Sequence, residues 1–239
     1  MRSLMLVLAL FVSQSTSLLA HDFEWKTLAI ASLKLRNQLD YEANVDSFME
    51  AFRPDVWNKY HDDEFEMVPK RKETIEMMKQ LVNSFSLQES FIVRTTTRLK
   101  NYDFESKKFP IDGWDESNYF YETEYQNGSF PRIFRVFMSN TEVFSGIPLN
   151  EQQAKEFIQS RKDRFGDIDR TVHMTISLKI VKQNIEPGDM VAEITKYRIY
   201  ADNNHKKLIY EYEVPKSTEP PKLGSDSKIS LAPKETATK

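Results

Sequence analysis

The sequence has 239 residues and contains no cysteine. It therefore offers no disulfide, no cysteine nucleophile and no cysteine for lipid attachment. Glycine is scarce, with 6 residues, and no GxGxxG, GxxxxGK[ST] or GxSxG motif occurs. Those motifs use glycine to bring backbone N–H groups close to a phosphate or to shape the turn beneath a nucleophilic serine. These absences argue against nucleotide-binding folds and α/β-hydrolases.

An excess of positive charge is also lacking. The chain has 33 Lys and Arg residues against 36 Asp and Glu residues, for a formal net charge of −3. Nucleic-acid binding rests on clustered positive charge, so we expect no nucleic-acid partner. The four histidines stand at positions 21, 61, 173 and 205. None has the short spacing of a metal-ligand motif, and the leading interpretation includes no cofactor and no metal site.

Residues 1–20 have the pattern of a secretory signal peptide. Arg2 precedes an apolar run from Leu4 to Val12, and small and polar residues follow. A membrane span needs about 20 apolar residues, roughly twice this run. We therefore predict cleavage after Ala20 and no membrane span in the mature chain. Together with the absence of cysteine, the signal favours a periplasmic or secreted bacterial protein.

Residues 21–88 are predicted to be a helical segment. Apolar residues recur there at helical spacing, and Pro54 ends one stripe and can open the next turn. The two clearest stripes are Val45, Phe48, Met49 and Phe52, and Ile75, Met78, Leu81, Val82 and Phe85. Core packing is the expected role of these stripes.

Residues 89–214 read as a domain of strands with one inserted helix near residues 150–164, whose N-cap is Asn150. Apolar and polar residues alternate along most of this part, as in half-buried strands. Asn127-Gly128 predicts a hairpin, and Gly188 predicts a type II turn. A break in the alternation near residues 195–197 suggests a β-bulge.

The last three strands are joined by short turns, which predicts an antiparallel meander. We therefore expect an α+β fold, in which the N-terminal helical segment packs on a mainly antiparallel sheet that ends in this meander. Residues 215–239 hold four prolines and few apolar residues, and we expect them to be a disordered tail.

Several short motifs are similar to those of exported bacterial domains of unknown function. They are Tyr102-Asp103-Phe104, Phe109-Pro110-Ile111, Ile147-Pro148-Leu149, a helix that carries Ala154, and Arg170 at the start of a long strand. The resemblance covers residues 90–182. It implies an envelope or secreted setting and assigns no catalytic residue.

Aromatic residues are concentrated between positions 102 and 125. Within this region Trp114, Tyr119, Tyr121 and Tyr125 are the candidate binding residues, because exposed aromatic side chains suit recognition surfaces. Aromatic residues are also favoured in ordinary strands, so the region could instead contribute to the core. The leading hypothesis is a non-catalytic exported protein that binds another protein or an envelope polymer.

Two alternatives remain open. Asp112, Asp115 and Glu116 surround Trp114 and could serve a carboxylate-dependent hydrolase of an envelope or extracellular polymer. Cleavage after Ala20 would make His21 the mature N-terminus, where its amine and imidazole could bind copper together with another histidine.

Overall fold

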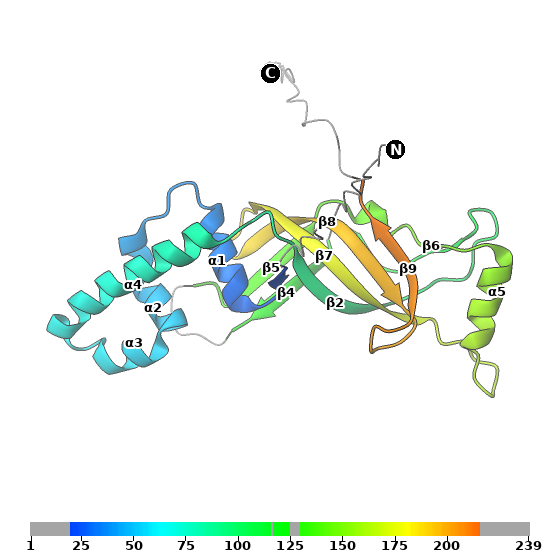
Figure 1. The fold of residues 1–239 in the computed structure, drawn as a ribbon, viewed down its shortest axis with the longest axis horizontal. Coiled ribbons are helices and arrows are strands. Elements are labelled where there is room, and N and C mark those ends of the chain that lie inside the picture. Colours follow the sequence, from blue (N-terminus) through cyan, green and yellow to red (C-terminus); the bar gives the residue numbers. More distant parts are fainter. Residues whose placement is uncertain (1–19, 116, 125–129, 216–239) are drawn as a thin grey trace, which may run out of the picture.

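The computed structural model describes residues 20–115, 117–124 and 130–215. The molecule is elongated: helices gather at one end, a twisted sheet fills the middle, and a single helix lies at the other end (Figure 1). The N-terminal helices are α1 (Trp25–Leu35), α2 (Tyr41–Phe52), α3 (Pro54–Tyr60) and α4 (Glu64–Ser84). The helix at the opposite end is α5 (Glu151–Ser160).

The strands form one large sheet and one small ladder. The large sheet has the order β1-β2-β7-β8-β5-β4, and β9 also pairs with β8. Its strands are β1 (His21–Asp22), β2 (Phe91–Arg98), β4 (Tyr119–Thr123), β5 (Ile133–Met138), β7 (Thr171–Gln183), β8 (Asp189–Tyr200) and β9 (Leu208–Glu213). The ladder joins β3 (Lys108–Phe109) to β6 (Ile147–Pro148), and a 3₁₀ turn covers Thr141–Phe144.

The predicted α+β fold and the antiparallel meander are both confirmed. Strands β7, β8 and β9 follow one another and pair antiparallel. The register between β7 and β8 shifts at Ser177 and Leu178, which pair with Lys196 and Ile194. Thr195 is therefore the extra residue of a bulge, where the alternation predicted one.

Local turn and cap signals also match the structure. Gly188 has φ +88°, and the N–H of Asp189 donates to the carbonyl oxygen of Glu186 at 3.0 Å. Asn150 and Gln153 form the expected capping box at the start of α5. Pro54 opens α3 directly after α2 ends. Strands β4 and β5 pair antiparallel, although the Asn127-Gly128 turn between them lies outside the described residues.

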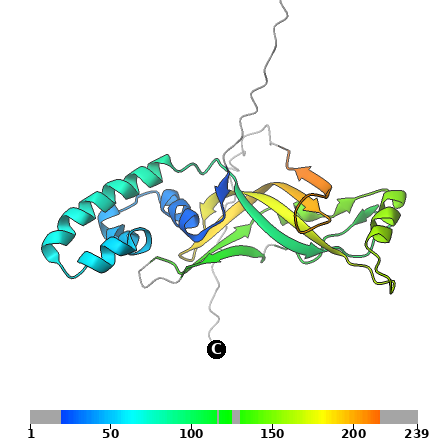
Figure 2. The same cartoon turned by 60° about the horizontal axis from the view of Figure 1, so that its bottom comes forward.

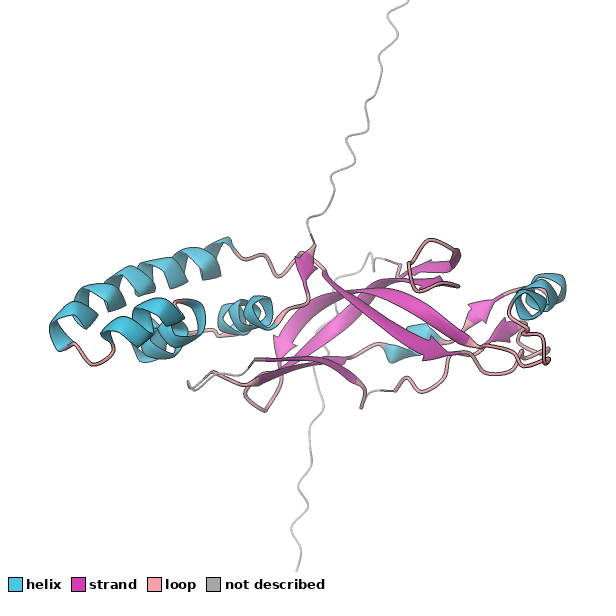
Figure 3. Cartoon of the chain, turned by 90° about the horizontal axis from the view of Figure 1, so that it is seen from below, coloured by secondary structure: helices cyan, strands magenta, loops and turns pink. Residues whose placement is uncertain are grey.

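The apolar residues of the strands meet on one side of the sheet, which we call the inner face. Phe134 and Val136 of β5, together with Met174 and Ile176 of β7, are fully buried there. Helix α1 packs on this face against β5 and β7, and Figures 2 and 3 show α1 between the sheet and the other helices. A second, smaller cluster stabilises the outer helices: Val45, Met49, Met67 and Ile75.

Two boundaries differ from the prediction. His21 and Asp22 were expected within the helical segment but form a short strand parallel to β2. The inserted helix ends at Ser160 instead of near residue 164. The Asp163 carboxylate accepts hydrogen bonds from the N–H groups of Phe165 and Asp167, which favours a turn over another helical turn.

No helix among the described residues is both long and apolar enough to cross a membrane. The predicted signal peptide, apart from Ala20, and the predicted tail, apart from Pro215, lie outside the described residues.

Candidate functional site

The candidate site lies on the β4–β5 hairpin, on the side of the sheet opposite α1. Along β4 the side chains alternate, so Phe120 points to the inner face while Tyr119 and Tyr121 point outward. Tyr119 is 44% exposed and Tyr121 is 60% exposed. The residues opposite them on β5 are Phe137 and Arg135. The outward side chains of both strands therefore form one continuous surface.

We call this surface the tyrosine face. Its members are Tyr119, Tyr121, Ile133, Arg135 and Phe137. The ring centroids of Tyr119 and Phe137 are 5.0 Å apart, and those of Tyr119 and Tyr121 are 6.2 Å apart. The guanidinium of Arg135 lies 5.9 Å from the centre of the Tyr119 ring, within the range of a cation–π contact. Ile133 extends the apolar surface and is 48% exposed.

The backbone of β4 adds a second feature. The N–H of Glu124 donates to the carbonyl oxygen of Arg132 at 3.0 Å. Hydrogen-bonded and non-hydrogen-bonded pairs alternate along an antiparallel ladder, so Glu122 and Phe120 are bonded to β5 in the same way. The backbone groups of Tyr119, Tyr121 and Thr123 then point away from β5. No strand among the described residues pairs with this edge.

The side chain of Arg135 is held in place by a hydrogen bond to Asp189. Its Nε donates to Oδ1 of Asp189 at 2.7 Å, and the Asp189 side chain is only 6% exposed. Hydrogen bonding to Asp189, and then its negative charge, raise the pKa of the Arg135 guanidinium. The pairing therefore fixes the position of the guanidinium on the tyrosine face.

On the inner face of β4, Glu122 lies near another carboxylate. Burial, and then the negative charge of Glu24, raise the pKa of the Glu122 carboxyl above its usual value. Folding therefore disfavours the ionised form of Glu122 relative to the unfolded chain.

The other sequence-predicted residues do not join this surface. Trp114 is half-buried and packs against Phe120 and Phe144, with ring centroids 5.6 and 4.8 Å away. Its indole Nε1 donates to Oγ1 of Thr97 at 3.4 Å. Trp114 therefore anchors its loop on the inner side of the sheet. Tyr125 lies outside the described residues.

Two of the three acids around Trp114, Asp112 and Asp115, belong to the described residues. Asp112 forms an ion pair with Lys100, at 3.0 Å between Oδ1 and Nζ. Hydrogen bonds from the side chain and the backbone N–H of Ser117 lower the pKa of Asp115, whereas a general acid needs a raised pKa. Glu116 lies outside the described residues, and the hydrolase alternative stays a prediction.

His21 contacts Phe85 and Ser86 and no other histidine. Its ring stacks on Phe85 at 4.2 Å, and Nε2 lies 3.0 Å from the carbonyl oxygen of Ser86. His173 and His205 instead lie near each other, with ring centroids 6.1 Å apart. The described part of the chain holds no group of three or more His, Cys, Asp or Glu side chains placed to hold a metal ion. The copper alternative stays a prediction.

Sequence reasoning identified Tyr119 and Tyr121 but missed Arg135, Phe137 and Ile133. The apolar alternation of residues 133–138 was visible, yet it does not reveal which residues of β5 stand opposite the tyrosines. That information comes only from the register of the hairpin.

Comparison with known proteins identifies a family for this chain. No curated protein and no solved structure matches the chain significantly. Residues 40–160 match the model of one protein family, described as Domain of unknown function (DUF4852). This range contains α2 to α5 and the whole tyrosine face, and it agrees with the resemblance to domains of unknown function. The chain belongs to the DUF4852 family.

Proposed function

We propose that the protein is an exported, non-catalytic binding protein that holds a partner protein on the tyrosine face. The observation that carries this proposal is the pair of exposed rings, Tyr119 and Tyr121, beside Arg135 on a sheet surface that no described helix covers. Tyrosine and arginine are the residue types most enriched where binding energy concentrates in protein interfaces.

The open edge of β4 favours a protein partner over a polysaccharide. The backbone N–H and C=O groups of Tyr119, Tyr121 and Thr123 can pair with an extended peptide segment that adds a strand to the sheet. Main-chain hydrogen bonds would supply affinity. The outward rings would contact alternate side chains of the added strand.

Export rests on the sequence of residues 1–20, with its single Arg2, short apolar run and polar end. A protein released by that signal would present the tyrosine face in the envelope or outside the cell.

The proposal is tested by binding to proteins from the envelope of the source bacterium. The amount of partner bound by the double variant Tyr119→Ser/Tyr121→Ser should be lower than that bound by the wild-type protein by a factor of roughly ten or more. A matched control removes two other exposed rings, Phe65 and Phe165, which are 89% and 77% exposed. Phe65→Ser/Phe165→Ser should bind like wild type. Equal loss in both variants, or no loss in the first, would contradict the proposal.

A further inference from the structure

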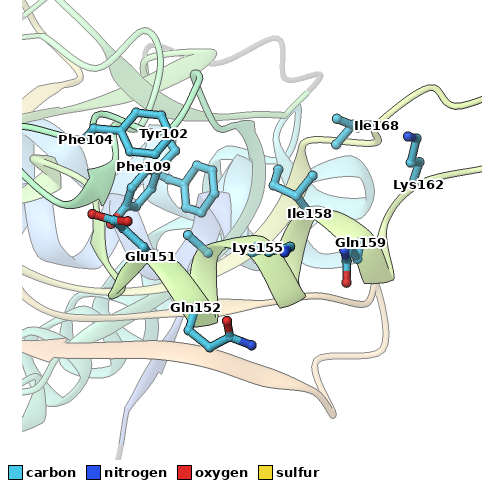
Figure 4. A pocket seen from close by; sticks show the side chains of 11 residues that line it. Tyr102, Phe104, Phe109, Glu151, Gln152, Lys155, Ile158, Gln159, Lys162 and Ile168 are labelled. Atoms are coloured by element: carbon cyan, nitrogen blue, oxygen red, sulfur yellow. The ribbon is translucent and has the colours of Figure 1, made fainter.

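A second possible binding site lies at the far end of the molecule, between α5 and the segment that contains β3. A cavity of about 540 Å³ opens there, a volume within the range of small-molecule sites. Figure 4 shows the aromatic rings of Tyr102, Phe104 and Phe109 facing one end of α5, with Lys162 and Ile168 toward its other end. None of these residues belongs to the tyrosine face.

Apolar side chains form most of the cavity wall, and several of them are buried. Phe109 is fully buried and Ala154 is 4% exposed, while Ile158 and Ile168 are half-buried. The hydroxyl of Tyr102 donates to the carbonyl oxygen of Leu149 at 2.7 Å. Because that polar atom is satisfied, the ring of Tyr102 presents only apolar surface to the cavity.

The opposite wall is fixed by local hydrogen bonds. The capping box of Asn150 and Gln153 fixes the first turn of α5, and Phe109 pairs with Ile147 in the β3–β6 ladder. Hydrogen bonds within the chain therefore hold both walls, which lowers the entropic cost of ordering them when a ligand binds.

The charged residues at the cavity are unbalanced. Lys155 and Lys162 line it together with one acid, Glu151. Neither lysine forms an ion pair with any residue that the structure describes. Glu151 lies at the end of the cavity near Tyr102, whereas Lys162 lies at the opposite end (Figure 4). Lys155 lies between them, in the middle of α5 (Figure 4). The part of the cavity between Lys155 and Lys162 can therefore receive an anionic group.

We infer that this cavity binds a single-chain anionic amphiphile. Its apolar tail would lie against Phe109 and Tyr102, and its anionic head would lie between Lys155 and Lys162. A fatty-acid carboxylate and a lipid fragment with an anionic head share this chemistry. The mainly apolar cavity, and two lysines at its edge that form no ion pair with a described residue, carry the inference.

Calorimetric titration of the purified protein tests it, with monomeric dodecanoate as the probe. Dodecyltrimethylammonium has an apolar tail of the same length but the opposite charge. Dodecanoate should bind saturably to one site and at least about threefold more tightly than the ammonium compound, since the lysines attract the carboxylate and repel the ammonium group. Absence of saturable dodecanoate binding, or equal binding of the two probes, would overturn the inference.

Two pairs of variants locate the site. Phe104 lines the cavity and is 70% exposed, whereas Phe165 is 77% exposed and does not line it. Phe104→Ser should weaken dodecanoate binding and Phe165→Ser should not. Lys155→Glu/Lys162→Glu should also weaken binding, whereas Lys72→Glu on the exposed side of α4 should leave it unchanged.

All five positions are solvent-exposed, and each control replaces the same residue type as the variant it accompanies. Melting temperatures should therefore show that each variant is folded. Dodecanoate binding that is insensitive to both Phe104→Ser and the lysine reversal would place the ligand elsewhere and overturn the assignment.

Discussion

Arg135 and Asp189 join two strands that are distant in sequence. The pair stands at the start of the parallel register between β5 and β8, and Nε of Arg135 lies 2.7 Å from Oδ1 of Asp189. The N–H of Arg135 also donates to the carbonyl oxygen of Gly188 at 3.0 Å. One residue of the tyrosine face is thus bonded through both its side chain and its backbone to the turn before β8. This relationship links the outer surface to the alignment of the central strands.

Replacing Arg135 should therefore destabilise the fold as well as change the surface. In Arg135→Met the Asp189 carboxylate, on a residue 5% exposed, loses its charged partner, and an unpaired buried charge is costly. We expect the melting temperature to fall by several degrees, and the double variant Arg135→Met/Asp189→Leu to recover part of that loss. Thermal unfolding followed by circular dichroism measures both.

The exposed ion pair of Lys79 with Glu76, at 2.7 Å, provides the control. Lys79→Met should change the melting temperature little, because exposed ion pairs contribute little. If Arg135→Met lowered the melting temperature as little as Lys79→Met, the buried Asp189 carboxylate would not need Arg135 as its charged partner.

Strand addition at β4 predicts a difference between two substitutions at one position. Thr123→Pro removes the backbone N–H that points to the open edge and leaves both tyrosine rings in place. Proline is tolerated on edge strands where its missing N–H is not needed by the sheet. Thr123→Val keeps the N–H group. Partner binding should fall in the proline variant alone, and equal binding by the two folded variants would argue that side chains alone hold the partner.

His205 predicts a pH dependence of stability. Burial, and then the charges of Arg94 and His173, lower the pKa of His205 below its usual value of 6.5. The unfolded chain then takes up this proton more readily than the folded chain. The stability that depends on neutral His205 is therefore complete above pH 6.5 and falls as the pH drops through 6.5 toward the folded-state pKa.

His205→Asn should remove this part of the dependence. Asparagine tolerates the positive φ of +54° at this position, although it loses the 2.9 Å contact between Thr175 Oγ1 and His205 Nδ1. Melting temperatures of wild type and variant between pH 8 and pH 5 should diverge least at the acidic end. A variant curve parallel to that of wild type would show that His205 does not contribute.

Alanine substitutions at Gly113 and Gly146 distinguish the cost of backbone strain from the cost of a steric clash. Gly113 has φ +74° with nothing within 4 Å of a built Cβ, whereas at Gly146, with φ +139°, that atom would lie 2.6 Å from the carbonyl oxygen of Phe109. Gly113→Ala should cost about 1–2 kcal/mol from backbone strain. Gly146→Ala should exceed about 3 kcal/mol, because it combines an unfavourable φ with a clash against fixed backbone. Denaturant unfolding compares the two, and equal costs would contradict this account.

Local signals in the sequence predicted local structure well. The bulge at Thr195, the turn at Gly188 and the capping box at Asn150 each depend on residues close in sequence, and all three were found. The parallel pairing of β5 with β8 was not foreseen. Alternation shows which residues of a strand share a face but not which distant strand lies beside it.

The same limit applies to the candidate sites. Tyr119 and Tyr121 could be predicted as candidates because two aromatic residues at alternate positions are visible in the sequence, whereas their exposure is seen only in the structure. Trp114, only five residues before Tyr119, instead packs against Phe120 and Phe144 on the inner side of the sheet. The cavity beside α5 depends on tertiary contacts between residues 102–109 and 151–168, and no local pattern reveals them.

Site-specific photo-crosslinking at Tyr121 tests the central claim most directly. A photoreactive benzoylphenylalanine would replace Tyr121 in the full chain, expressed in the organism that encodes it, and a second protein would carry it at Phe65 on α4. We predict a discrete protein adduct from position 121 that is absent from position 65, identified by mass spectrometry. No adduct at position 121, or the same adducts from both positions, would contradict the assignment of the tyrosine face as the binding surface.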